Sequence, residues 1–342
     1  MDRREFLKAG AAAIAASAGA KLAWAQTPGM AGWTNHLDAY SRTLHWLRTP
    51  GEVAAACHEI GNTTIDLTVR PYPGHVQPEN VRTDLPLFVN GLKREGITVT
   101  KIAMDVADVN TPHVEAMLDT ASSLGIHHTW WRGLPFDWSL GYQAMLDGLK
   151  PRVETLARML ERYSFKACYH PGGEFTKLLD LCRGFDPRHI SIQYDTGNFG
   201  QFRQAMLANQ IRMGGSYIGS FVFKDSLVER VFPQQQVGAN AAGDAGAAGR
   251  GGRGGRGGGG SPNGWTSRQV PVGTGVLDLP VICQALKDIN FLGPMHCQPE
   301  WPELGGPGQG RDTITIPRGE VIRLLRRDYL TVSAPLAEAG VI

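Results

Sequence analysis

Short apolar runs alternate with longer segments of helical periodicity eight times after residue 35. The short runs have the length and the period-two pattern of strands, and the longer segments have the 3.6-residue repeat of amphipathic helices. Gly or Asp-Pro follows several of the helical segments, where a stop signal is expected. Strands are predicted at 40–46, 63–71, 97–106, 126–133, 165–170, 190–195, 217–225 and 293–301. Helices are predicted at 49–60, 81–95, 112–124, 142–163, 175–184, 202–213, 278–289 and 318–329.

Eight successive strand–helix units predict an α/β fold, a (β/α)8 TIM barrel, over residues 35–340. A doubly wound open sheet is the alternative. Such a sheet usually carries a G-x-G-x-x-G fingerprint after an early strand, and the sequence has none there. The barrel is therefore the favoured fold.

Alternation within the strands indicates which residues line the barrel. In the strand at 63–71, every second residue from Ile65 to Val69 is aliphatic, whereas Asp66, Thr68 and Arg70 form a polar row. Three later strands give comparable rows of one parity: Ser191, Gln193 and Asp195; Val222 and Lys224; and His296, Gln298 and Glu300. The more polar rows are expected to face the interior and to end at the carboxyl mouth, where ligands bind in such barrels.

The first 25 residues are predicted to be an export signal rather than part of the fold. The segment 2–8 contains an arginine pair that resembles a twin-arginine signal, a small-residue stretch follows at 9–20, and Ala23-Trp24-Ala25 matches an A-x-A cleavage site. A membrane anchor is the alternative, but the apolar run is short for a span of roughly 20 residues. We therefore expect a periplasmic protein that is delivered by the twin-arginine export machinery.

The charge balance gives no reason to expect a nucleic-acid or membrane partner. The whole chain has a formal net charge of +2, and removal of the signal takes away four of 34 basic and two of 32 acidic residues, which leaves a neutral chain. Residues 238–264 contain three RGG-like steps, which raises the alternative of an RNA-binding tract. Three arginines without hydrophobic periodicity favour a disordered loop inserted after the seventh strand.

Chemically capable side chains gather at the predicted carboxyl ends of the strands. They are Arg70, Asp105, Arg132, His170, Glu174, Asp195, Asn198, Lys224, Asp225, Gln298 and Glu300. A G-x-S-x-G elbow, an H-E-x-x-H motif and a phosphate-binding loop are all missing from the sequence. One imidazole, several carboxylates and a few cations around a cavity suit a divalent metal such as Mn²⁺, Mg²⁺ or Zn²⁺. Such an ion would acidify a neighbouring C–H or O–H of a sugar.

These residues also have structural interpretations, which the sequence leaves open. Turn chemistry that caps a helix would account for 195–198, and a helix dipole would account for Glu174. His170 could be a hydrogen-bonded core histidine. Lys224 could form a structural ion pair with Asp225, and Arg132 could pair with a carboxylate of the core. Trp301 is either a core residue or a ring on which a sugar stacks.

The order of several motifs resembles one family of barrels. The chain reads DLTVRP, WWRG, YHPGGEF, QYDTGN, FKD, VPVGTGVLD and GPMHCQPEW, and in this order it is similar to the xylose isomerase-like (AP endonuclease family 2-like) TIM barrels. The similarity is to the exported branch called sugar phosphate isomerase/epimerase and covers about residues 35–340. It implies a divalent metal at the mouth of the barrel and proton transfer on sugars or polyols.

The ligand set that the resemblance implies, a Glu, an Asp, a His and a Glu on late strands, is present only in part. Asp195 matches the Asp, Glu300 the last Glu, and His170 the histidine often found after strand five in this branch. Val222 replaces the histidine of strand seven, and Gln298 stands where many relatives carry a Glu. The resemblance therefore implies a metal held by His170, Asp195 and Glu300, in a weakened or rearranged site.

Together these patterns predict a periplasmic sugar isomerase or epimerase that moves a proton next to a carbonyl with the help of a metal. In this hypothesis Asp195, Glu300 and His170 hold either the metal or the substrate hydroxyls directly. Lys224 stabilises an enediolate oxygen and replaces part of the charge of the metal, while Glu174 or His170 moves the proton. The substrate-binding residues are predicted to be Arg70, Arg132, Asn198 and Trp301.

Two other functions stay open at this point. An acidified C–H also permits β-elimination, so the chain has the groups of a lyase or hydrolase acting on oxidised (keto) glycosides. A non-catalytic carbohydrate-binding barrel with a degenerate metal site is the third possibility, for which Val222 and Gln298 are the main support. Export makes a phosphorylated substrate less expected than a free or oxidised sugar.

Overall fold

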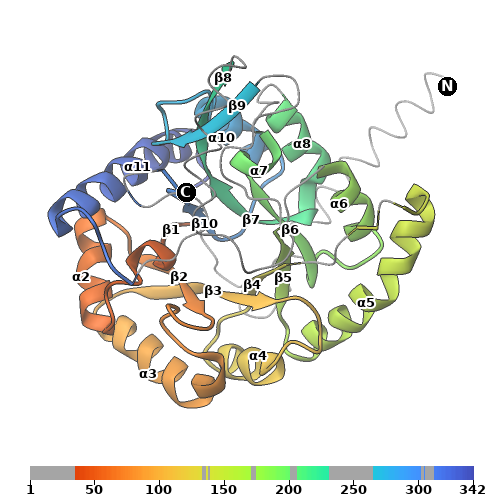
Figure 1. Cartoon of the computed structure of the whole chain (residues 1–342), viewed down its shortest axis with the longest axis horizontal. Coiled ribbons are helices and arrows are strands. Elements are labelled where there is room, and N and C mark those ends of the chain that lie inside the picture. Colours follow the sequence, from red (N-terminus) through yellow and green to blue (C-terminus); the bar gives the residue numbers. More distant parts are fainter. Residues whose placement is uncertain are drawn as a thin grey trace, which may run out of the picture.

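Eight parallel strands close into a barrel in the order β1-β10-β7-β6-β5-β4-β3-β2, with helices packed around it (Figure 1). A computed structural model describes residues 35–132, 136–137, 139–170, 175–200, 206–230, 265–301, 304 and 312–342. The strands of the barrel are β1 (Leu37–Tyr40), β2 (Thr64–Val69), β3 (Thr98–Val106), β4 (His128–Trp131), β5 (Lys166–Tyr169), β6 (Ile190–Asp195), β7 (Ile218–Phe223) and β10 (Met295–Cys297). Because β1 pairs with both β2 and β10, the sheet closes, and the predicted (β/α)8 barrel is confirmed.

The described helices follow the strands in the predicted alternation, except that β6 is followed by two helices, the first of which was not predicted. They are α2 (Pro50–Ile60), α3 (Val81–Arg94), α4 (Val114–Ser123), α5 (Tyr142–Arg162), α6 (Phe175–Cys182), α7 (Thr196–Gly200), α8 (Leu207–Gly214), α10 (Leu279–Asp288) and α11 (Arg318–Ala339). Thr49 begins α2 with a capping box to Glu52, and Gly61 ends it in the left-handed conformation, as the start and stop signals predict. The predicted signal at 1–25 and the segment 238–264 lie outside the described residues.

The first strand lies earlier than the predicted 40–46. It ends at Tyr40, and residues Ser41–Leu44 form a 3₁₀ turn, η1, instead of continuing the strand. The hydroxyl of Ser41 accepts the backbone N–H of Thr68 at 2.9 Å, so a side chain takes the place of the next ladder bond. This turn places the residues after β1 across the mouth of the barrel rather than along its wall.

A two-stranded hairpin is an addition that the alternation did not predict. β8 (Asp225–Arg230) pairs antiparallel with β9 (Trp265–Val270), and Figure 1 shows the hairpin at the rim, beside α10. The carboxylate of Asp225 accepts backbone N–H groups from Gly273, Gly275 and Leu277 at 2.8 to 3.0 Å. This fan of hydrogen bonds ties the base of the hairpin to the loop that leads into α10.

Inside the barrel, the predicted polar rows meet one another. Lys101 of β3 forms an ion pair with Asp66 of β2, with 2.9 Å between Nζ and Oδ2, and both side chains are at most 1% exposed. The same ammonium donates to Gln193 of β6 at 2.8 Å, and Ser220 of β7 also donates to Gln193. These contacts join four strands across the interior, so the assignment of the polar rows to the interior is confirmed.

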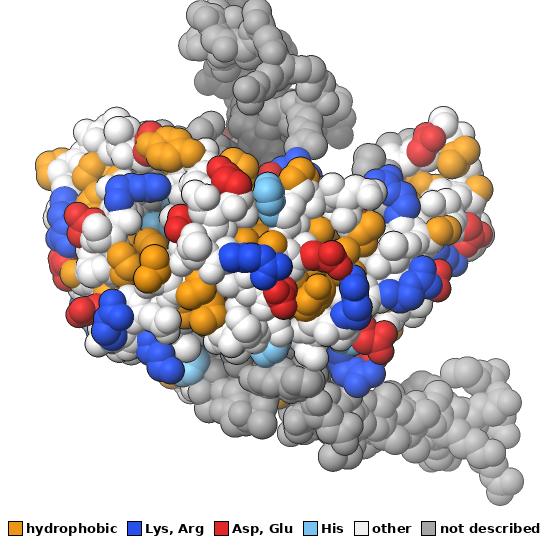
Figure 2. All heavy atoms as spheres, turned by 90° about the horizontal axis from the view of Figure 1, so that it is seen from below, with side chains coloured by type: hydrophobic (Ala, Val, Ile, Leu, Met, Phe, Trp, Pro, Cys, Tyr) orange, Lys and Arg blue, Asp and Glu red, His pale blue; other side chains and the backbone are white. Residues whose placement is uncertain are grey.

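The exterior shows no concentration of one charge on the face seen in Figure 2, where basic and acidic side chains are interspersed with hydrophobic ones. Several described charges form exposed ion pairs, for example Arg82 with Asp119 and Arg162 with Glu115. Among the described helices, none combines the length and the apolar character that a membrane crossing requires.

Asp38 on β1 is buried at the bottom of the interior and should make stability depend on pH. Burial raises the pKa of Asp38 to about 7, against the opposing hydrogen bond from Thr100 at 2.6 Å. At pH values between 3.8 and about 7, Asp38 is protonated in the folded state and ionised in the unfolded state. Its contribution to the free energy of unfolding is therefore complete below pH 3.8 and decreases as the pH rises to about 7. The slope is about 1.4 kcal/mol per pH unit.

We therefore expect Asp38→Asn to flatten the pH dependence of the free energy of unfolding. Urea unfolding of the wild type and the variant at pH 5 and pH 7 measures this directly. The wild type should lose more stability than the variant between these two values, by an amount set by the slope above. Equal losses in the two proteins would show that the folded state does not hold a proton on Asp38.

Candidate active site at the carboxyl end of the barrel

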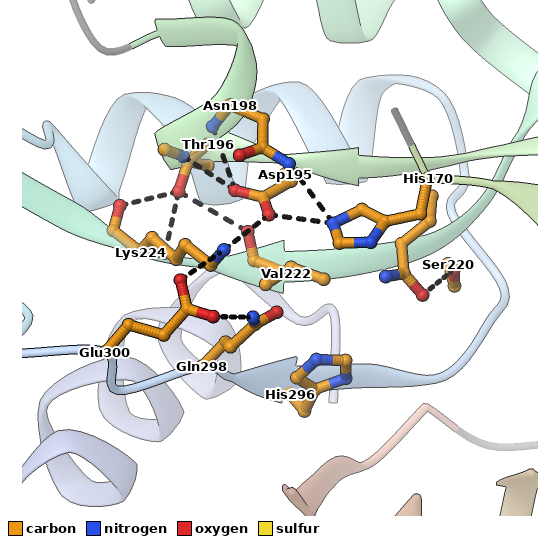
Figure 3. Close-up of polar contacts among 12 residues, drawn as sticks. His170, Asp195, Thr196, Asn198, Ser220, Val222, Lys224, His296, Gln298 and Glu300 are labelled. Atoms are coloured by element: carbon orange, nitrogen blue, oxygen red, sulfur yellow. Dashed lines mark hydrogen bonds and ion pairs between the residues drawn. The ribbon is translucent and has the colours of Figure 1, made fainter. Parts of the chain in front are cut away.

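Four side chains from separate strand ends meet at the mouth of the barrel (Figure 3). The ammonium of Lys224, after β7, lies 2.9 Å from Oδ2 of Asp195 and 3.0 Å from Oε2 of Glu300. His170, after β5, places Nε2 3.0 Å from the same oxygen of Asp195. The sequence predicted that the groups at 170, 195 and 300 would share one place, and the structure brings them together around Lys224.

The two carboxylate oxygens of Asp195 have different partners: one accepts hydrogen bonds from the backbone, and the other contacts side chains of the site. At the end of β6, its Oδ1 accepts the N–H groups of Gly197 and Asn198 at 2.9 and 3.0 Å and so begins α7. Its Oδ2 points at Lys224 and His170, and the side chain is fully buried. Burial by itself would raise the pKa of Asp195, but the charge of Lys224 and the contact with His170 bring that pKa well below its usual range. Asp195 is therefore a carboxylate throughout the physiological range.

Lys224 is held at its backbone as well as at its ammonium. Its N–H donates to the hydroxyl of Thr196 at 2.8 Å, and that hydroxyl donates to the carbonyl of Lys224 at 2.7 Å. The side chain is 2% exposed. Burial alone would lower the pKa of Lys224, but the carboxylates of Asp195 and Glu300 raise it above its ordinary value. The lysine is therefore a fixed cation.

Glu300 lies on the open side of this cation. Its Oε1 accepts the side-chain amide of Gln298 at 2.5 Å, and its Oε2 accepts that of Gln269 at 3.2 Å. Gln269 belongs to β9, so the hairpin contributes to the site. Sequence reasoning missed Gln269, because the pairing of β9 with β8 spans a segment without hydrophobic periodicity and leaves no local signal.

His170 lies against an aromatic ring and an amide. The ring of Trp130 meets it edge-to-face with the centroids 5.5 Å apart, and Nδ2 of Asn198 lies 3.2 Å from its Nε2. The imidazole is 11% exposed. Asn198, predicted to bind substrate, thus lies beside a predicted catalytic residue.

A group of arginines occupies the mouth on the side of β2 to β4. Arg132 forms an ion pair with Asp105, and Arg70 lies 3.9 Å from the same carboxylate oxygen. Arg42, on the turn after β1, belongs to the same region: burial would lower its pKa, but Tyr40 and nearby carboxylates that include Asp105 raise it. Arg70 and Arg132, both predicted to bind substrate, therefore lie together on Asp105. Arg42 was missed because its turn was predicted to be a strand.

Two other predicted site residues do not join this group. Trp301 is 2% exposed, and the guanidinium of Arg327 on α11 covers its ring at 5.1 Å. This placement does not support the predicted role in sugar stacking, because a covered ring has no face to offer to a substrate. Glu174, predicted to move a proton, lies outside the described residues.

Below the site, His296 of β10 connects it with the buried pair of the interior. Its ring is 1% exposed, stacks on Tyr40 at 4.5 Å and lies 3.5 Å from Asp66. Burial, together with the charge of Lys101, brings the pKa of His296 well below its ordinary value, so this imidazole is neutral. Sequence reasoning placed His296 on the correct row without giving it a role.

The residues at the mouth do not fit a divalent metal in this arrangement. The oxygens of Asp195 and Glu300 that face each other both contact the ammonium of Lys224, and Nε2 of His170 points at Asp195. Within the described part of the chain, no three His, Cys, Asp or Glu side chains are grouped as a metal site. The assignment of His170, Asp195 and Glu300 as metal ligands stays a prediction from the sequence, and this geometry does not support it.

The model of the xylose isomerase-like TIM barrel family matches residues 54–316. The chain belongs to this family. No curated protein is detectably similar in sequence.

Solved structures share the fold at low sequence identity. D-psicose 3-epimerase from Clostridium cellulolyticum H10, solved with D-tagatose, is 13% identical with a TM-score of 0.57, and the match covers 88% of this chain and 99% of that one. The IOLI protein, solved with a zinc atom, is 12% identical with a TM-score of 0.56, over 89% and 98% of the two chains. A family member from Mycobacterium smegmatis, solved with magnesium, is 14% identical with a TM-score of 0.55, over 89% and 98%.

We expect Gly197→Ala to destabilise the protein by about 1–3 kcal/mol, the usual range for overpacking. A Cβ at Gly197 would lie 2.9 Å from Cβ and 3.0 Å from Cδ of Lys224, so the lysine stem would have to move. Gly148→Ala is the control, because it adds a methyl group within α5 where no atom lies within 4 Å. The control should stabilise by roughly 0.5–1 kcal/mol. Urea unfolding that gives both changes the same sign would contradict the close packing at Gly197.

Proposed function

We propose that this protein is a sugar isomerase or epimerase that transfers a proton at a carbon next to a carbonyl group. The observation that carries the proposal is the ammonium of Lys224, fixed between Asp195 and Glu300 and next to His170 at the carboxyl end of the barrel. Membership of the xylose isomerase-like family supports it, as does the similar fold of D-psicose 3-epimerase.

Proton removal next to a carbonyl puts negative charge on the carbonyl oxygen. In this proposal the ammonium of Lys224 stabilises that charge. A buried cation that is already in place stabilises a developing enediolate without reorganisation. Because both carboxylate partners hold the ammonium, its position does not depend on the substrate. The role predicted for Lys224 from the sequence is thus part of this proposal.

His170 and Glu300 are the groups that exchange the proton in this proposal. Figure 3 shows them on opposite sides of the pair formed by Lys224 and Asp195. Both are partly exposed, at 11% and 12% of their side chains. One base on each side is the arrangement that inversion at a carbon requires, since one group removes the proton and the other returns one to the opposite face. Glu174, close to His170 in the sequence, stays a predicted alternative base.

Substrate binding is assigned to the arginine side of the mouth. Arg70 and Arg132 both approach Asp105 and carry further N–H groups that suit the hydroxyl and carbonyl oxygens of a sugar. Asn198, beside His170, is placed to contact the part of the substrate that reacts.

No step of this mechanism uses a metal, because the donor set does not fit one. The predicted lyase or hydrolase activity on oxidised glycosides would start from the same proton removal, and the masses of the products distinguish the two reactions. A binding barrel without catalysis is less well supported, because binding alone does not require a buried cation between two carboxylates. Export to the periplasm is also a proposal, supported by the arginine pair and the A-x-A site near the N-terminus.

The test of the function is the exchange of hydrogen with solvent. The purified protein should incorporate deuterium from D₂O into a ketohexose or ketopentose at a carbon next to the carbonyl, as followed by NMR. We expect His170→Gln and Glu300→Gln to slow this exchange by roughly 10²–10⁴-fold, the range for loss of general acid–base catalysis. His58→Gln is the matched control, because His58 is exposed on α2 and should leave the rate unchanged. Failure to exchange with any sugar would argue against the proposal.

The arginine assignment has a separate kinetic signature. Arg132→Gln should raise KM about tenfold or more while changing kcat less, because it removes a contact made in both the ground state and the transition state. Arg152→Gln is the control, since this arginine pairs with Asp108 in an exposed position. A fall in kcat at constant KM in Arg132→Gln would instead place the guanidinium at the reacting atoms.

A further inference from the structure

The ammonium of Lys224 lies between the two carboxylates at the mouth of this barrel, a place that a divalent cation could also fill. Two similar structures contain zinc and magnesium, whereas in this chain an ammonium lies between the two carboxylates of the mouth. We propose that Lys224 takes the place of a divalent cation in this barrel, so that the site works without a metal. The proposal concerns the site of the proposed function, but its test measures metal binding and is independent of any activity.

The contacts of Nζ are those of a cation shared by two ligands. Asp195 and Glu300 come from different strand ends, and each directs one oxygen to the same nitrogen, at 2.9 and 3.0 Å. Asp195 is fully buried and the side chain of Lys224 is 2% exposed. Two carboxylates this close together repel each other unless a cation lies between them. Lys224 meets this requirement, and a second cation would be repelled by it.

Within the part of the chain that the structure describes, two positions next to the carboxylates, Val222 and Gln298, provide no replacement ligand. Val222 of β7 is in register with both Asp195 of β6 and His296 of β10, and it is fully buried. It therefore occupies the central place in this row with a hydrocarbon side chain, which cannot bind a metal. Gln298 uses its amide N–H as a donor to Glu300, so it presents a donor to the carboxylate rather than a further negative ligand.

Backbone hydrogen bonds and close packing also hold Lys224 in position, so its ammonium cannot easily move away from the two carboxylates. Its backbone N–H and C=O are both bonded to the hydroxyl of Thr196. Its stem passes so close to Gly197 that a Cβ there would lie 2.9 Å from Cβ of the lysine. The next residue, Asp225, is fixed by the loop that contains Gly273 and Gly275. A metal ion that displaced the ammonium would have to break this packing.

The proposal predicts a gain of metal binding on removal of the lysine. Titration of the full chain with Mn²⁺, followed by electron paramagnetic resonance, should show no saturable site in the wild type at micromolar concentrations. Lys224→Met leaves two carboxylates and an imidazole facing an apolar side chain, so we expect one Mn²⁺ per chain with an affinity raised tenfold or more. Adding Asp195→Asn to Lys224→Met should remove the new site.

Controls keep the outcome decisive. Lys150→Met removes an exposed lysine that pairs with Asp147 and should not change Mn²⁺ binding. Circular dichroism shows whether Lys224→Met is folded, and Mn²⁺ should raise the melting temperature of this variant but not that of the wild type. A folded Lys224→Met that gains no affinity would overturn the proposal. Tight binding of one Mn²⁺ by the wild type, lost in Asp195→Asn, would overturn it without any need for the lysine variant.

Discussion

The ion pairs of Lys224 are the interaction on which the mouth of this barrel depends. Two carboxylates and one ammonium are withdrawn from water there, and each charge is stable only because the others are present. Removal of one partner from such a buried group typically destabilises a protein by about 3–5 kcal/mol, since an uncompensated charge remains. The same coupling keeps Asp195 ionised and Lys224 protonated, so the charges of the site are set by the fold.

Backbone hydrogen bonds on both sides of the chain hold these charges in place. Asp195 begins α7 with one oxygen, Thr196 bonds the backbone of Lys224, and Asp225 gathers the N–H groups of the loop before α10. The adjacent side chains of Lys224 and Asp225 thus serve different partners, and the structure shows no ion pair between these two described residues. The interpretation of Lys224 and Asp225 as a structural ion pair is therefore wrong, because Asp225 is engaged by backbone N–H groups.

Alternation along the strands was sufficient to predict the barrel and the row of residues that lines it. The period-two pattern placed Asp66, Gln193 and His296 on interior rows, and contacts across the barrel confirm those placements for Asp66 and Gln193. If the alternation is continued beyond the end of β10, Trp301 lies on the opposite face from Glu300, towards the surrounding helices. The contact of Trp301 with Arg327 on α11 agrees with this placement. The substrate-stacking role of Trp301 stays a prediction that this placement does not support, and it was made from residue type without regard to parity.

Other features had no signal in the sequence. The hairpin depends on pairing between strands that are separated by the glycine-rich segment, so neither β8 nor the contact of Gln269 with Glu300 follows from a local pattern. The place of Arg42 depends on a turn that a side-chain hydroxyl of Ser41 creates by replacing a ladder bond. Both are long-range effects, in which a tertiary contact decides the conformation of a short segment.

An ammonium and a divalent metal can both stabilise the negative charge of two carboxylates and of a substrate oxygen, but to different extents. An ammonium carries one positive charge and donates directional hydrogen bonds, whereas a metal carries two charges and polarises an oxygen more strongly. A site that depends on Lys224 therefore needs further positive charge near the substrate. The mouth supplies it, because Arg70 and Arg132 both approach the single carboxylate of Asp105. In the proposed metal-free site, the arginine group and the lysine together spread over several side chains the charge that a metal would concentrate at one point.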